Sequence, residues 1–232
     1  MGPTAQITTL DRKGEFAAYL ARPQGPAKAA VLVIQEVFGI NEGIRRKCDA
    51  WAQAGYLAAA PDLFWRFKPG IQLDPDIPEQ MQEALGYFGQ YDPDDGVKDI
   101  EATIRWLRRE GGAAKVGCVG FCLGGKLAYM AATRTDVNAS VAYYPVGIDR
   151  MIGESHAIAH PLLIHIASAD GFVSPEAQQR MHEGLDAHAK VTIFDYPGLD
   201  HGFAAEMGNR RDEAGAQLAD RRTREFLAEH LG

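Results

Sequence analysis

The sequence has few cysteines, no long apolar run and no excess of positive charge, and each absence excludes a class of protein. Its three cysteines, Cys48, Cys118 and Cys122, form a small and odd-numbered set in 232 residues. Such a set is typical of reduced thiols in a cytoplasm and unlike the disulfide framework of a small secreted protein. None of them has a histidine or cysteine partner at metal-ligand spacing, so the sequence predicts no metal and no other cofactor.

Membrane and nucleic-acid partners are disfavoured by two further absences. No apolar run approaches the length of a membrane span, and residues 1–14 show neither the apolar core nor the cleavage site of a signal peptide. The formal net charge of −7 argues against binding to nucleic acid or anionic lipid through bulk charge. We therefore expect a cytoplasmic protein, a monomer or weak homodimer, whose partner is a small molecule.

Strand-length apolar runs alternate with helical patterns along the chain. At 46% hydrophobic and 24% charged residues, the composition suits one domain over residues 1–232. Strands are expected at 14–22, 29–34, 56–60, 115–121, 137–144, 161–166 and 191–194. Helices are expected at 41–54, 79–88, 97–107, 127–132, 174–187 and 212–231. This alternation predicts an α/β fold, a mostly parallel sheet with helices on both faces.

The least regular stretch, residues 63–95, is rich in proline and aromatic side chains. A segment of this kind after a strand often covers a substrate. Packing against the protein without contact to a ligand is an equally good interpretation of the composition.

Residues 120–124, Gly-Phe-Cys-Leu-Gly, have the Gly-x-nucleophile-x-Gly form of a nucleophile elbow, with Cys122 in the serine position. A strand that turns directly into a helix crowds its neighbours, so only glycine fits at Gly120 and Gly124. The helix N-terminus beneath the sulfur favours a thiolate and a developing oxyanion. A buried cysteine in a glycine-rich turn is the alternative, but the expected strand before it and helix after it favour the elbow.

His201 and Asp170 are the candidates to activate this cysteine. His201 lies in a glycine-flanked loop after the last expected strand, and Asp170 follows the strand before it. The order nucleophile, acid, histidine is that of the α/β-hydrolase fold. Asp195 and Asp200 compete for the acid role, although the first lies on a strand and the second directly precedes the histidine. His165, inside an expected strand, is interpreted as a core residue.

The sequence resembles the dienelactone hydrolase family, small α/β-hydrolases with a cysteine nucleophile, over nearly the whole chain. The resemblance is carried by Gln35-Glu36-Val-Phe-Gly39, Pro61-Asp-Leu-Phe64, Gly120-Phe-Cys-Leu-Gly-Gly125, Tyr143-Tyr144, Ala169-Asp170 and His201-Gly-Phe-Ala204. It implies a triad of Cys122, Asp170 and His201, and a resting-state carboxylate, Glu36, that pairs with the thiol. It also implies oxyanion-binding backbone N–H groups at Leu123 and Val37.

The chain departs from the family where substrate carboxylate is bound. Met81 and Ala205 stand where two arginines are expected, and Leu85 replaces a tyrosine. Each missing cation removes a charge-assisted contact of about 1.5–3 kcal/mol. Arg66, Arg210 or Arg211 could substitute. Further candidates for substrate contact are Phe38, Arg66, Phe88, Tyr144 and Phe172.

Three functions follow from these residues. The first is a hydrolase of lactones or small esters, of the dienelactone to maleylacetate type, acting through a thioester on Cys122. The second keeps this chemistry but prefers neutral esters, since two arginines are missing. The third is a binding module without catalysis on the same fold, because a fold alone does not establish a function.

Overall fold

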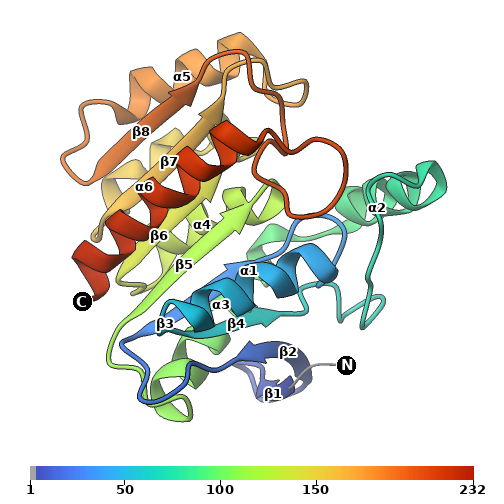
Figure 1. Ribbon diagram of the computed structural model, residues 1–232, viewed down its shortest axis with the longest axis vertical. Coiled ribbons are helices and arrows are strands. Elements are labelled where there is room, and N and C mark those ends of the chain that lie inside the picture. Colours follow the sequence, from blue (N-terminus) through green and yellow to red (C-terminus); the bar gives the residue numbers. More distant parts are fainter. Residues whose placement is uncertain (1–3) are drawn as a thin grey trace.

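A single sheet runs through the centre of the protein (Figure 1). The computed structural model describes residues 4–232; residues 1–3, part of the segment considered above for a signal peptide, lie outside it. The eight strands follow the order β1-β2-β4-β3-β5-β6-β7-β8. Their bounds are β1 Thr4–Thr8, β2 Glu15–Ala21, β3 Ala30–Ile34, β4 Leu57–Pro61, β5 Val116–Phe121, β6 Ala139–Tyr143, β7 Leu162–Ala167 and β8 Val191–Tyr196.

Six of these strands, from β4 across to β8, are parallel, and β1 and β2 pair antiparallel at one edge. Strand β3 shows why the central strands are continuously apolar. Val31 and Val33 pack into one hydrophobic core, while Leu32 and Ile34 pack into the core on the opposite face. Because both faces are buried, no position of the strand is left for a polar side chain.

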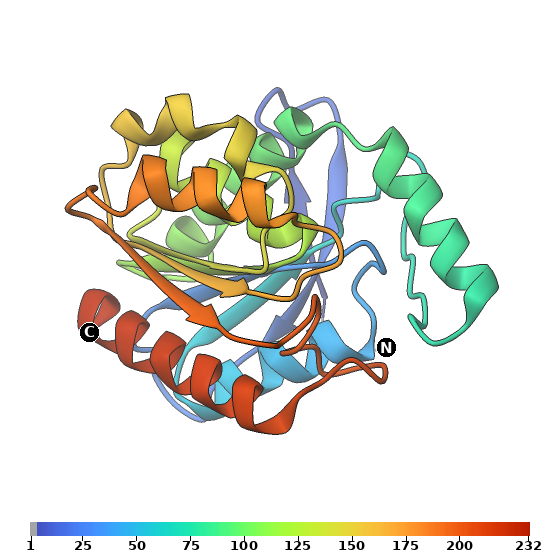
Figure 2. The ribbon, with the colours of Figure 1, turned by 90° about the horizontal axis from the view of Figure 1, so that it is seen from above.

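Helices cover both faces of the sheet (Figure 2). Helices α1 (Glu42–Gln53) and α6 (Glu213–Leu231) lie on one face. Helices α3 (Pro93–Arg109), α4 (Leu123–Arg134) and α5 (Pro175–Leu185) lie on the other. The expected mostly parallel sheet with helices on both faces is thus confirmed. Two short 3₁₀ helices, Ile148–Arg150 and Ile152–Ala157, were not predicted.

Local capping signals explain where several helices begin. The side chains of Asn41, Ser174 and Asp212 accept hydrogen bonds from backbone N–H groups in the first turns of α1, α5 and α6. This contact satisfies a donor that has no acceptor inside the helix. The expected helix at 79–88 is longer in the structure, α2 (Pro78–Gln90), and it projects from the body of the protein (Figure 2).

His165 is a core residue, as its place in a strand predicted. Its Nε2 lies 2.9 Å from Oγ1 of Thr223 on α6, and its Nδ1 lies 2.8 Å from the hydroxyl of Tyr196 on β8. Burial lowers the pKa of His165 to about 3, and the charge of Arg222 adds to the shift. The ring is therefore neutral in the folded protein well below the pH at which an unfolded chain would protonate it.

This buried imidazole is expected to weaken the fold in mild acid. Between pH 6.5 and about 3 the unfolded chain binds a proton at His165 and the folded chain does not, so stability falls as the pH falls. From pH 7 to pH 5 the loss from this group is about 2 kcal/mol. In His165→Gln, the free energy of unfolding measured in urea should fall by about 2 kcal/mol less than in the wild type between pH 7 and pH 5. The exposed His156→Gln should keep the wild-type dependence, and equal losses in all three proteins would contradict the prediction.

Candidate active site

The turn between β5 and α4 places Cys122 in a strained backbone conformation. Its φ of 55° and ψ of −113° lie in a region that residues with a side chain rarely adopt. A Cβ added at Gly120 would lie 1.9 Å from the carbonyl oxygen of Gly124, and one added at Gly124 would lie 2.4 Å from that of Ile34. Gly120 therefore allows the first turn of α4 to follow the strand this closely, and Gly124 allows α4 to lie against the end of β3.

The three cysteines differ in their access to the site. Cys122 is half-buried and lines a cavity, whereas Cys48 and Cys118 are fully buried. Burial raises the pKa of Cys118 to about 11, against the opposing effect of its contact with Ser140, and burial also raises that of Cys48. Both buried thiols therefore stay protonated near neutral pH, and neither lines the cavity.

Asp170 and His201 come together from the ends of two neighbouring strands, β7 and β8. Nδ1 of His201 lies 2.8 Å from Oδ2 of Asp170, and both side chains are buried. The other carboxylate oxygen of Asp170 accepts a hydrogen bond from the backbone N–H of Phe172 at 2.7 Å. Asp170 is thus held rigidly and can fix the orientation of the imidazole.

The two other acids considered in the sequence have different partners. Asp200 accepts hydrogen bonds from the backbone N–H groups of Gly171 and His201, so it ties the two loops together. Asp195 lies 3.2 Å from Nε2 of His182, at the surface. Neither carboxylate is hydrogen-bonded to the His201 ring.

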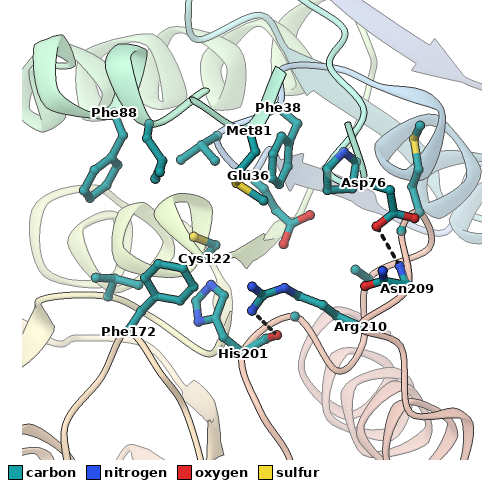
Figure 3. Close-up of a pocket in the computed structure, with 18 residues that line it drawn as sticks. Glu36, Phe38, Asp76, Met81, Phe88, Cys122, Phe172, His201, Asn209 and Arg210 are labelled. Carbon is teal, nitrogen blue, oxygen red and sulfur yellow. Dashed lines mark hydrogen bonds between the residues drawn. The ribbon is translucent and has the colours of Figure 1, made fainter. Parts of the chain in front are cut away.

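The imidazole of His201 lies beside the sulfur of Cys122 (Figure 3). Burial lowers the pKa of His201, but the charge of Cys122 and hydrogen bonds with Asp170 and Cys122 outweigh burial and raise the pKa to about 10. The arrangement therefore favours an imidazolium beside the sulfur of Cys122. The imidazolium supplies an acid for the leaving group, and the sulfur supplies the nucleophile.

Glu36 and Val37, which follow β3, line the same cavity as Cys122 and His201. Burial raises the pKa of Glu36, although the charges of His201, Lys47 and Arg210 and a contact with Tyr144 oppose the shift. A carboxyl group in this position holds a proton more readily than one in water. Leu123 is the first residue of α4, so its backbone N–H has no acceptor inside the helix and remains available to an oxyanion.

The cavity has a volume of about 310 Å³. Three predicted contact residues, Phe38, Phe88 and Phe172, line it. The three positions at which the chain departs from the family also lie in its wall: Met81, Leu85 and Ala205. Loop residues that no sequence motif indicated complete the wall: Pro75, Asp76, Val146, Met207, Gly208 and Asn209.

Two of the predicted contact residues lie elsewhere. The guanidinium of Arg66 pairs with Asp99 and stacks on Trp65, so it is held away from the cavity. Tyr144 is fully buried behind His201, with ring centroids 4.9 Å apart, and does not line the cavity. Its φ of 35° and the lack of a hydrogen-bond partner for its hydroxyl among residues 4–232 mark a strained, buried position.

The remaining arginines have different positions. Arg211 is engaged by Glu206 and Glu213. Arg210 lines the cavity, where its guanidinium lies 3.8 Å from Asp200 and 5.6 Å from the Phe172 ring (Figure 3). Arg210 is therefore the arginine that the structure brings to the site from the three considered in the sequence.

Two kinds of feature are absent from the part of the chain that the structure describes. No cluster of three or more His, Cys, Asp or Glu side chains in residues 4–232 could hold a metal ion. In the same part of the chain, none of the helices combines the length and apolarity needed to cross a membrane.

Comparisons with known proteins identify the family of the chain. The profile of the Dienelactone hydrolase family matches residues 16–231. A provisionally named carboxymethylenebutenolidase of Azospirillum brasilense is 40% identical over 222 residues, covering 94% of this chain and 95% of its own. Carboxymethylenebutenolidase 1 of Cupriavidus pinatubonensis is 34% identical, covering 93% and 92%. The crystal structure of a provisionally named dienelactone hydrolase from Klebsiella pneumoniae superposes with a TM-score of 0.82 at 28% identity, covering 97% of this chain and 98% of its own.

Proposed function

The chain belongs to the dienelactone hydrolase family and is a carboxylic ester hydrolase, and we propose that it cleaves a lactone or small ester through a thioester on Cys122. The observation that supports this most strongly is the meeting, in one cavity, of a strained Cys122 and a His201 that is hydrogen-bonded to Asp170. The resemblance inferred from sequence motifs is confirmed by the family match.

In the proposed first half-reaction, the sulfur of Cys122 attacks the carbonyl carbon of the substrate. The negative charge that develops on the carbonyl oxygen is stabilised by the backbone N–H groups of Leu123 and Val37. The intermediate then collapses, the C–O bond breaks, and His201 gives its proton to the departing oxygen. In a lactone that oxygen remains attached to the acyl group, so the ring opens onto the thioester.

In the second half-reaction, His201 removes a proton from water as the water oxygen attacks the thioester carbonyl. The C–S bond breaks, the acid product leaves and the thiolate–imidazolium pair returns. Asp170 keeps the ring oriented and stabilises its charge through the 2.8 Å hydrogen bond. We assign Glu36 to the resting enzyme, where it pairs with Cys122 as a thiol. Substrate displaces the carboxyl group, and the thiol proton passes to His201 to give the thiolate–imidazolium pair.

The thioester can be tested directly. Acid quenching of the wild-type protein during turnover of p-nitrophenyl acetate should show a mass increase of one acetyl group on the peptide that contains Cys122. Steady hydrolysis of p-nitrophenyl acetate and of dienelactone should accompany it. Acetylation confined to another residue, or no hydrolysis of either substrate, would refute the proposal. The latter result would favour the binding-module hypothesis.

The domain organisation, cellular location and oligomeric state of the protein are proposals as well. We propose that residues 1–232 act as one domain, because all eight strands join one sheet. Three free cysteines and a net charge of −7 support a cytoplasmic location and a small-molecule partner, without nucleic acid or membrane. We expect a monomer or weak homodimer, which sedimentation at several concentrations would distinguish from a stable oligomer.

A further inference from the structure

One side of the cavity is apolar and belongs to the projecting helix. Met81, Leu85 and Phe88 of α2 line it together with Phe172 from the loop after β7. We call these four residues the apolar arm. Figure 3 shows Phe88 and Phe172 on one side of Cys122 and Arg210 on the other. A group attached to an ester carbonyl at the sulfur would therefore meet hydrocarbon in one direction and polar side chains in the other.

The apolar arm is incompletely covered by the protein itself. Leu85, Phe88 and Phe172 are 46%, 37% and 50% exposed, although large hydrophobic side chains of this kind are usually buried. Ala84 of α2 is buried in the core and Met81 packs partly against it, whereas Leu85 and Phe88 line the cavity and stay exposed. Exposed apolar side chains gathered around a cavity mark a place where a ligand removes them from water.

The charges around the cavity offer little attraction to an anion. The side chains that can carry charge in its lining are Glu36 and Asp76, which are acidic, and Arg210 and His201, which are basic, so the cations have no excess over the carboxyl groups. Arg210 is further compensated by Asp200 at 3.8 Å, outside the lining. A carboxylate in the substrate would have to displace these partners, while Met81 and Ala205 offer it no donor.

We infer that the substrate is an uncharged ester or lactone that carries an alkyl or aryl group, and that this group binds in the apolar arm. The inference rests on the proposed function and specifies its substrate class. Each methylene group of the substrate that is buried in the apolar arm raises kcat/KM by about fourfold. A carboxylate at the end of the same chain removes this gain, because burying its charge without a partner is unfavourable.

The test uses two matched pairs of esters, because the chain could lie on either side of the carbonyl. Methyl hexanoate is compared with monomethyl adipate, and pentyl acetate with 5-acetoxypentanoate, by proton release at constant pH. In at least one pair the neutral ester should have a kcat/KM about tenfold higher or more. Equal or faster hydrolysis of the anionic ester in both pairs, with p-nitrophenyl acetate still cleaved through Cys122, would overturn the inference and leave the proposed function standing.

A variant pair then locates the effect. Leu85→Arg places a cation in the apolar arm and should lower the neutral-to-anionic preference about tenfold or more. Leu10→Arg alters another exposed leucine, 41% exposed and outside the cavity, and should leave the preference unchanged. An unchanged preference in Leu85→Arg would overturn the assignment to the apolar arm. Absence of Cys122-dependent hydrolysis with every ester would overturn the proposed function and this inference together.

Discussion

Replacement of Cys122 by alanine is expected to lower kcat for ester hydrolysis by about 10⁴-fold or more. The variant removes the atom that forms the thioester, and His201 and Asp170 have no other nucleophile to activate in the cavity. The fold should survive, because alanine keeps the Cβ that the strained turn already accommodates and loses only a half-buried sulfur. Initial rates with p-nitrophenyl acetate and a thermal melt, both relative to wild type, measure the two effects.

Cys118→Ala is the matched control for this prediction. Cys118 lies four residues earlier on β5, is fully buried and faces Ser140 at 3.3 Å. Its replacement should lower the stability of the protein, because it removes a buried side-chain atom. It should leave kcat within about twofold of the wild-type value, since the sulfur of Cys118 does not reach the cavity. A folded Cys122→Ala protein with more than a tenth of the wild-type rate would show that the nucleophile lies elsewhere.

Replacement of Gly120 by alanine is expected to have the largest effect on folding. The new Cβ would lie 1.9 Å from the carbonyl oxygen of Gly124 and 3.0 Å from the backbone nitrogen of Gly125. Backbone atoms in the first turn of α4 cannot move away without opening the junction of strand and helix. We expect a loss of about 4 kcal/mol or more in the free energy of unfolding, or no soluble protein.

Gly86→Ala is the matched control, and we expect it to stabilise the protein where Gly120→Ala destabilises it. Gly86 lies inside α2, and a Cβ there would meet nothing within 4 Å. Alanine in an unobstructed helix position should stabilise the protein by up to about 1 kcal/mol. Urea unfolding of both variants provides the comparison. A Gly120→Ala protein within about 1 kcal/mol of wild type would mean that the turn tolerates a side chain and that crowding does not explain the motif.

Features that depend on neighbouring residues could be predicted from the sequence. The requirement for glycine at Gly120 is local, because a Cβ there would meet the carbonyl oxygen of Gly124, but the clash at Gly124 is with Ile34 at the end of β3 and depends on the packing of the sheet. The starts of α1 and α5 follow from single capping side chains at Asn41 and Ser174. The succession of strands and helices along the chain follows from apolar periodicity, apart from β1, which was not predicted.

Choices between similar side chains were decided by the tertiary structure. Three acids in the second half of the chain competed for the position beside His201; the sequence favoured Asp170 by its place after a strand, and the packing of the loops after β7 and β8 brings Asp170 to the ring. Arg66 was an equal candidate to Arg210 in the sequence, but the buried Asp99 holds it away from the cavity.

The tertiary structure also decided the positions of Tyr144 and of residues 63–95 relative to the cavity. Tyr144 follows a strand that ends at the site, yet its backbone turns the ring behind His201. The composition of residues 63–95 was compatible with a wall of the site or with mere packing, and the structure places α2 at the cavity. The amino-acid sequence thus determined the glycine before the nucleophile and the succession of the elements along the chain, since these depend on contacts between near neighbours. Which distant loops meet above the sulfur depended on long-range packing, which no local pattern encodes.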